Sequence, residues 1–322
     1  MNRYRLVHVT EFSYDGPVTE SYNEVRLRPL QDELQSCLSF RLSTDPNSRV
    51  SSSTDYFGNV VHRFNVLAEH RRLRVEADSV VLVQAPALFP SGGPELGELE
   101  QIASDLDEHY ELLASTEYVP HAPQLRDLVD TAERNCDGTM ANYALAASDV
   151  VHDTFRYEQG ATHVHSSIRD AIATRAGVCQ DFAHILLALL RMRGLPGRYV
   201  SGYLVPRRTA EPGASVEEII GGQASHAWAE VFLPTFGWAA LDPTLGQLVG
   251  LQHVRIAYGR DYGDVAPVRG VYKGHAGQQL SVDVRVRPAL DDEGTEHLEE
   301  TCAAPSQPQI DTLPQQHQQQ QQ

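Results

Sequence analysis

One cysteine, one histidine and one aspartate stand where a thiol-dependent reaction would need them. Cys179 directly precedes an apolar run, His226 lies near the start of an alternating segment, and Asp242 lies near the end of the next one. A thiolate is a strong nucleophile, and an imidazolium beside it stabilises the thiolate and protonates a leaving amine. A carboxylate fixes the tautomer and orientation of the ring. These residue types in this order predict nucleophilic acyl chemistry at Cys179.

Cys179 is expected at the start of a buried helix. Residues 182–192 are almost wholly apolar, which is typical of a central helix, and Gly194 followed by Pro196 predicts its end. Unpaired N–H groups and the positive dipole end at a helix start favour thiolate over thiol. Gly177 allows a close backbone approach just before the cysteine. The alternative is that this cysteine is a small buried hydrophobe, as free cysteines often are.

His226 and Asp242 are expected on the two strands of one hairpin, with a turn at 234–237. A three- or five-residue loop places Asp242 opposite Trp228, diagonal to His226 on the same face. A four-residue loop places it opposite Ala229, on the wrong face. Each residue also has an ordinary interpretation, as a hydrogen-bonded strand histidine and as a turn residue before a proline. Their combination with a cysteine at a helix start favours a catalytic triad.

Composition and periodicity divide the chain into four parts. Residues 1–85 alternate apolar and polar positions with a period of two, which is typical of antiparallel strands. Residues 86–150 are predicted to be a Pro- and Gly-rich linker followed by helices, with a break near Cys136. Residues 151–290 mix one strong helix with several strands and form the predicted core. Residues 291–322 are acidic and Gln-rich, so we expect a disordered tail.

The first 85 residues contain three turn signals between the expected strands. They are Asp15-Gly16-Pro17, Asp45-Pro46-Asn47-Ser48 and Gly58-Asn59. No nucleophile stands beside a base in this part of the sequence. We therefore expect a scaffold or recognition domain.

Charge and cysteine usage exclude several classes of function. The 322 residues carry a formal charge of −17 without a Lys/Arg cluster, which argues against a nucleic-acid partner. The first residues lack the apolar core of a signal peptide, and the run Ile185–Leu190 is too short to span a bilayer, so no membrane partner is expected. Four distant cysteines without a CxxC pair predict free thiols in a cytoplasmic protein. There is no D-x-D-x-D-G calcium loop, and no metal or other cofactor is predicted.

Motifs spread over most of the chain point to one family. The segments are GVCQDFAH (177–184), SHAWAEVFLPTFGWAALDPT (225–244), Phe155-Arg156-Tyr157, YDGPVTESYNEVRLRP (14–29), DYFGNVVHRF (55–64) and HVRIAYGRDYGDVAPVRGVY (253–272). Together they resemble the bacterial transglutaminase-like superfamily. The resemblance implies an α+β protein, with an N-terminal antiparallel β domain followed by a papain-like core whose Cys-bearing helix packs on an antiparallel sheet. It also implies that Cys179 is the nucleophile, His226 the base and Asp242 the third member.

The implied chemistry is acyl transfer from a peptide or protein amide to Cys179 through a thioester. Analogy with two-domain bacterial relatives favours hydrolysis, as in a peptidase or amidase. Amine transfer, which crosslinks proteins, and a non-catalytic peptide-binding module are the alternatives. The backbone N–H of Cys179 is the expected oxyanion donor. The candidate substrate contacts are Gln180, Trp228, His253 and Tyr262, and packing in the hairpin core is the alternative for Trp228.

Overall fold

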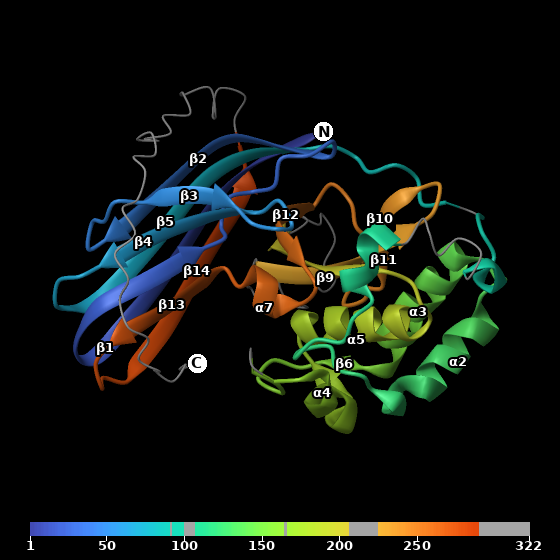
Figure 1. Cartoon of the computed structure of the whole chain (residues 1–322). Coiled ribbons are helices and arrows are strands. Elements are labelled where there is room, and N and C mark those ends of the chain that lie inside the picture. Colours follow the sequence, from blue (N-terminus) through green and yellow to red (C-terminus); the bar gives the residue numbers. More distant parts are fainter. Residues whose placement is uncertain (91, 100–106, 164–165, 206–224, 290–322) are drawn as a thin grey trace, which may run out of the picture.

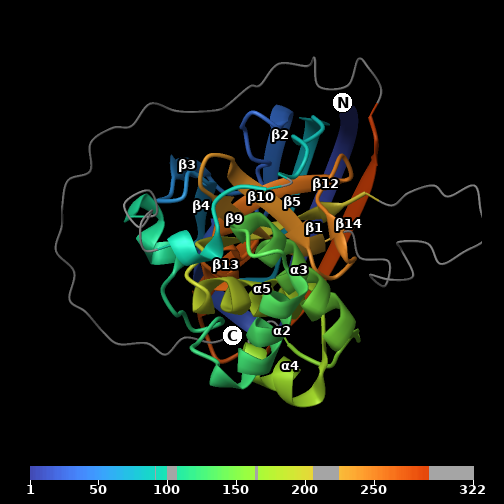
Figure 2. The same ribbon diagram turned by 90° about the vertical axis from the view of Figure 1, so that its right-hand side faces the viewer.

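The computed structural model arranges the chain in three layers (Figure 1). A large antiparallel sheet lies on one side, a group of helices on the other, and a smaller antiparallel sheet between them (Figure 2). The tail that we expect to be disordered, 291–322, lies outside the described residues. Those residues are 1–90, 92–99, 107–163, 166–205 and 225–289.

The large sheet is built around one very long strand. Its first five strands are β1 (Asn2–Val25), β2 (Gln35–Asp45), β3 (Ser51–Thr54), β4 (Val60–Val66) and β5 (His70–Val83). The turn predicted at 15–17 is wrong, because β1 continues through it. The strand instead changes partners there: its pairing with β5 breaks between Ser13 and Val18, and β4 takes over further along. Pro17 has no N–H to donate, which suits a gap in the ladder. The chain does turn between β2 and β3 and between β3 and β4, as predicted.

The last strands of the described chain return to this large sheet. We expected the core to include everything up to residue 290, but β13 (Val268–Lys273) and β14 (Gln278–Pro288) both pair with β1. Val286 lies opposite Leu6 and packs against the cluster that contains it. A period of two identifies a strand but not its sheet, so the sequence pattern could not assign these strands.

The core combines helices with a five-stranded sheet of order β11-β10-β9-β8-β12. The strands of this sheet are β8 (Gly197–Leu204), β9 (Ser225–Leu233), β10 (Gly237–Asp242), β11 (Gln247–Leu248) and β12 (His253–Gly259). Two further short strands of the core, β6 (Arg156–Tyr157) and β7 (Ala176–Gly177), pair only with each other. The helices of the core are η1 (Leu96–Glu98), η2 (Asp107–Leu112), η3 (Pro123–Leu125), α2 (Arg126–Asn135), α3 (Met140–Thr154), α4 (Ile168–Thr174), α5 (Cys179–Met192) and α7 (Tyr262–Val265).

α5 is the central helix of the core, as the apolar run predicts. It packs against β8 and β9 on one side and against α2, α3 and α4 on the other (Figure 2). Five of its aliphatic side chains are 0% exposed: Ile185, Leu186, Leu187, Leu189 and Leu190. The helix ends where predicted, because Gly194 adopts φ +85°, a left-handed conformation that closes a helix and suits glycine. An antiparallel sheet packed on a Cys-bearing helix confirms the expected papain-like α+β fold.

The large sheet docks on the outer edge of β12. The side chain of Gln35 accepts a hydrogen bond from the N–H of Arg255 and donates to its carbonyl, at 2.8 and 2.7 Å. Asn59 makes the same two bonds with Tyr258, at 3.0 and 2.9 Å. Together with the backbone N–H of Leu30, which donates to the carbonyl of Arg255 at 3.1 Å, the two side-chain amides thus take the place of a neighbouring strand on this sheet edge.

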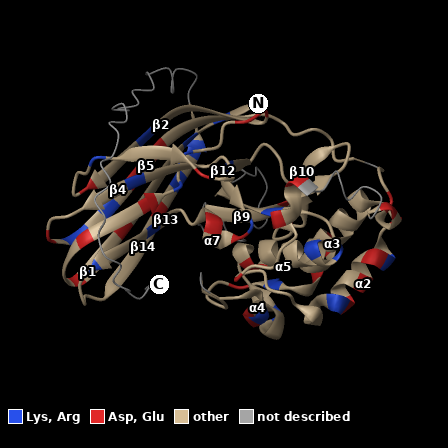
Figure 3. Cartoon of the chain, in the orientation of Figure 1, with Lys and Arg blue, Asp and Glu red and all other residues tan. Residues whose placement is uncertain are grey.

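Charges of both signs are interspersed along the strands of the large sheet (Figure 3). Arg5 pairs with Asp78, and Arg63 with Glu24, across neighbouring strands. In the part of the chain that the structure describes, no helix is long and apolar enough to cross a membrane.

Candidate active site

Cys179 is the first residue of α5, and a buried carboxylate shapes the turn before it. Oδ2 of Asp181 accepts the N–H of Val178 at 2.8 Å and the hydroxyl of Thr162 at 2.5 Å. The carboxylate excludes any side chain at position 177, because a Cβ built on Gly177 would lie 2.6 Å from the same oxygen. The carboxylate therefore caps the helix and holds the backbone that presents the half-exposed Cys179.

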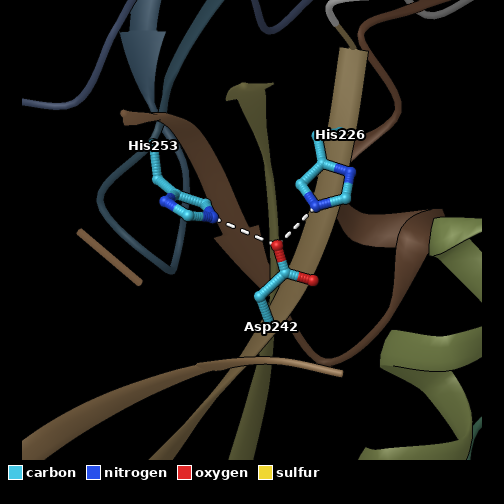
Figure 4. Close-up of side chains that lie close together, drawn as sticks. All are labelled: His226, Asp242 and His253. Carbon is cyan, nitrogen blue, oxygen red and sulfur yellow. Dashed lines mark hydrogen bonds and ion pairs between the residues drawn. The ribbon is translucent and has the colours of Figure 1, made fainter. Parts of the chain in front are cut away.

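The hairpin formed by β9 and β10 has the register that brings His226 and Asp242 together. Its loop contains three residues, 234–236, and Leu241 pairs with Ala229, so Asp242 stands opposite Trp228. Nε2 of His226 lies 2.7 Å from Oδ2 of Asp242 (Figure 4). The three-residue loop is one of the two lengths that place both side chains on one face.

His226 connects Asp242 with Cys179. The side chain of His226 is 0% exposed. Among the described residues, none forms a well-aligned hydrogen bond with its Nδ1. Cys179 nevertheless lies close enough to interact with the ring, and Nε2 is already engaged by Asp242. Burial opposes the charged imidazolium, but the carboxylate of Asp242 and the Cys179 side chain outweigh it and raise the pKa of His226.

Asp242 is held ionised although it is fully buried. Burial by itself would raise the pKa of Asp242, but the charge of His226 and hydrogen bonds from His226 and His253 hold it well below the usual range. Its other oxygen, Oδ1, accepts the N–H groups of Thr244 and Leu245 at 3.0 and 3.2 Å. The site can therefore keep an imidazolium between a carboxylate and a thiol.

His253 occupies a different place from the one we expected. It is 3% exposed and lies behind Asp242, with Nε2 at 3.1 Å from the same Oδ2 that His226 contacts (Figure 4). Nδ1 accepts the N–H of Gly250 at 3.1 Å. The predicted substrate contact is thus corrected to a contact with the carboxylate, which the side chain of His253 reaches although β8 and β9 lie between β12 and β10 in the sheet.

The same three side chains carry the nitrogen and oxygen atoms that commonly bind metal ions in proteins. Ligand atoms of His226, Asp242 and His253 all lie within 4.8 Å of one another. However, Nδ1 of His253 accepts a hydrogen bond from Gly250, so its Nε2 carries the proton of the neutral ring and donates it to Asp242. A protonated nitrogen has no lone pair for a metal, and this donor set fits a hydrogen-bonded cluster better than a metal site.

Trp228 is also corrected, because it is 0% exposed and cannot meet a substrate in this structure. β9 is a central strand covered on both faces. The indole packs edge-on against His253, with ring centroids 5.2 Å apart, and against the ring of His226. Gly202 on β8 makes room for it, since a Cβ there would lie 2.4 Å from the indole.

The remaining expected substrate contacts lie around α5. Gln180 is 7% exposed on the first turn. Tyr262 is half-buried beside Tyr118 and Tyr199, its backbone N–H donates to Nε2 of His184 at 3.1 Å, and burial raises the pKa of its hydroxyl to about 12. Contact of Gln180 or Tyr262 with a substrate stays a prediction.

Sequence reasoning missed three contributors to the site: Thr162, Asp181 and Gly250. Asp181 had a recognisable signal, since an acidic residue at the third helical position is typical of a capped start. Thr162 and Gly250 act through contacts that depend on how distant loops fold back, so spacing along the chain carries no signal for them.

A half-exposed cysteine at the start of a buried helix, facing a histidine and an aspartate on the adjoining sheet, defines a transglutaminase-like protein with a papain-like core. The model of the bacterial transglutaminase-like N-terminal region matches residues 4–82, and that of the transglutaminase-like superfamily matches 126–243. The chain belongs to the transglutaminase-like superfamily.

Several relatives cover most or part of the chain. An uncharacterized protein of Mycobacterium leprae is 38% identical over 286 residues, which is 89% of this chain and 99% of the relative. A protein-glutamine gamma-glutamyltransferase of Pseudomonas aeruginosa is 30% identical over 128 residues, 38% of this chain and 18% of the relative. Among solved structures, a protein of Cytophaga hutchinsonii that is provisionally named a cysteine protease has a TM-score of 0.67 and 22% identity, covering 90% of this chain and 92% of that one. At 22% identity, the likeness to the Cytophaga hutchinsonii protein shows a similar fold and nothing more.

Proposed function

We propose that this protein is a cysteine-dependent enzyme that hydrolyses an amide bond of a peptide or protein. The observation that carries the proposal is the buried His226, which stands between the carboxylate of Asp242 and the side chain of Cys179 with a raised pKa. A raised pKa keeps the imidazolium available at neutral pH, where it both stabilises the thiolate and can give up a proton. Membership of the transglutaminase-like superfamily supports the same assignment.

The reaction proceeds in two balanced halves. The thiolate of Cys179 attacks the amide carbonyl carbon, the C–N bond breaks, and His226 gives its proton to the leaving amine. The backbone N–H of Cys179, on the first turn of α5 where helix N–H groups lack helical partners, stabilises the oxyanion. Water then attacks the thioester while His226 takes a proton from it, which releases a carboxylic acid and restores the imidazolium–thiolate pair.

Amine transfer is the second candidate, and one comparison favours it. The relative from Pseudomonas aeruginosa is named a protein-glutamine gamma-glutamyltransferase and matches part of this chain at 30% identity. An amine would replace water in the second half of the reaction and leave an isopeptide bond. The first half is the same in both cases.

The decisive experiment combines thiol labelling with a peptide-library assay in the presence and absence of a primary amine. We expect iodoacetamide to label Cys179 faster than Cys37 and Cys136, and peptide cleavage to disappear in Cys179→Ala and fall steeply in His226→Ala. Cys136→Ala is the matched control and should behave like the wild type. Incorporation of the amine without release of a free acid would favour crosslinking. Equal, slow labelling of all cysteines with no turnover would contradict both enzymatic proposals and leave the peptide-binding module.

We also propose that the protein works in the cytoplasm. Cys37, Cys136 and Cys179 are free thiols, and Cys302 lies outside the described residues. A reducing compartment keeps such thiols active. Fractionation of cells that express the tagged chain tests this placement, and recovery outside the cytoplasm would contradict it.

A further inference from the structure

We propose that His253 is a positioning residue of this site, a neutral imidazole that donates Nε2–H to Asp242 and so aims the carboxylate at His226. The inference rests on the proposed function of Cys179, His226 and Asp242. It adds a fourth side chain that touches no substrate and acts through Asp242.

The hydrogen bonds of His253 determine its tautomer. The N–H of Gly250 can only donate, so Nδ1 of His253 is the acceptor and carries no proton. The proton of the neutral ring is then on Nε2, which lies 3.1 Å from Oδ2 of Asp242. Charging the ring would require a proton on Nδ1 and the loss of the bond from Gly250. The backbone at 250 therefore keeps His253 a donor without a charge.

The second imidazole changes what Asp242 can do. Oδ2 receives Nε2–H from both His226 and His253, while Oδ1 receives the backbone N–H groups of Thr244 and Leu245. Four donors on two oxygens oppose rotation of the carboxylate. Because His253 is neutral, it spreads the negative charge of Asp242 without placing a second positive charge next to His226.

His253 is itself held in place from several sides. Its side chain is 2% exposed, Trp228 packs edge-on against the ring, and its backbone pairs with Leu204 on β8. The strand that it begins, β12, is bound along its outer edge by Gln35 and Asn59 of the large sheet. The donor is therefore built on a rigid element, which a positioning role requires.

Removing this donor has two measurable consequences. A carboxylate with fewer donors is freer to rotate away from His226, and we expect kcat to fall about tenfold with KM unchanged, the loss that one hydrogen bond to a charged group implies. The remaining charge of Asp242 also falls more fully on His226. The titratable side chains that interact with His226 among the described residues are Asp242, Cys179 and His253. We therefore expect the alkaline limb of the pH–kcat profile, where His226 loses its proton, to move to higher pH.

Three variants separate positioning from folding. His253→Leu removes the donor, and His253→Gln offers an amide N–H near the position of Nε2, so the glutamine variant should recover most of the kcat and the wild-type alkaline limb. His70→Leu, a buried histidine of the large sheet, is the control for replacing a buried histidine and should leave kcat and the profile unchanged. Urea unfolding of each variant shows that the comparison is made on folded protein.

An NMR measurement reads the cluster without turnover. Long-range 1H–15N spectra of the full chain should show His253 as the Nε2–H tautomer at neutral pH, and should show His226 titrating at higher pH in His253→Leu than in the wild type. A charged or Nδ1–H ring at position 253, or a leucine variant with wild-type kcat and His226 titration, would overturn the inference. Slow labelling of Cys179 in the wild type would instead refute the proposed function, and the spectra would still decide the role of His253 toward Asp242.

Discussion

Gly177→Ala offers a sharp test of how the cysteine is presented. An alanine Cβ would lie 2.6 Å from Oδ2 and 2.8 Å from Cβ of Asp181, closer than atoms approach in proteins. Either Asp181 leaves the N–H of Val178 or the turn before Cys179 moves. Both outcomes disturb the first turn of α5.

The sign of the stability change is diagnostic. At an unstrained site, replacing glycine by alanine stabilises a protein by about 0.4–1 kcal/mol through the unfolded chain. Here the charge-assisted hydrogen bond from the N–H of Val178 to Asp181 is 2.8 Å long. Losing it leaves a buried carboxylate, 1% exposed, with one hydrogen-bond donor fewer. The loss of such a bond is worth about 1.5–3 kcal/mol. We therefore expect a net destabilisation of about 0.5–2.6 kcal/mol.

Urea unfolding and the rate of Cys179 alkylation are the two measurements. Gly97→Ala is the matched control, since no atom of the described residues, apart from its own neighbours along the chain, lies within 4 Å of a Cβ built there, and it should be neutral or slightly stabilising. Gly177→Ala should lose stability and also react more slowly at Cys179, because the helix start no longer presents the thiol to His226. A Gly177→Ala protein that is as stable as the control and alkylated at the wild-type rate would refute the reasoning.

Three further substitutions probe the sheet and the titrating groups. Asp242→Asn removes the carboxylate that raises the pKa of His226, so Cys179 alkylation at pH 6 should slow by about tenfold or more; an unchanged rate would argue against the triad. Gly202→Ala should destabilise the chain by about 3 kcal/mol in urea unfolding, since its Cβ would lie 2.3 Å from a carbonyl oxygen of β12, and a wild-type midpoint would contradict this. Burial lowers the pKa of His8 from 6.5 to about 4, so the unfolded chain binds a proton that the folded one refuses and stability falls as pH drops from 6.5 toward 4. The His8→Gln variant should lose less stability than the wild type between pH 7 and 4.5, by up to about 3 kcal/mol. Urea unfolding of both proteins at these two pH values measures the difference, and equal losses would contradict the role given to His8.

The chemistry-bearing part of the site could be predicted because it depends on local patterns. A helix start, an alternating strand and a short turn each leave a signature within a few residues, and together they placed Cys179, His226 and Asp242 near one another. The surroundings of these residues could not be predicted in the same way. Trp228 is among the candidate substrate contacts, but a strand in the middle of a sheet between two layers has no open face.

The large sheet shows a second limit of pattern reasoning. Alternation correctly predicted strands in the first 85 residues, but β1 is continuous through a Gly-Pro pair that usually marks a turn. Two ladders of different partners meet at that point, and the interruption lies in the pairing rather than in the strand. Partner choice depends on residues 268–288, which lie far away in sequence and contribute β13 and β14. Non-local pairing leaves no trace in local periodicity.

The N-terminal sheet contributes more than a scaffold, because it completes the strand on which His253 stands. β12 is an edge strand of the core sheet, and edge strands are free to fray unless their outer hydrogen-bonding groups are engaged. Gln35 and Asn59 engage them at Arg255 and Tyr258, two and five residues beyond His253. His253 is the first residue of this strand and donates to Asp242, so the N-terminal sheet contacts the same strand that carries this donor.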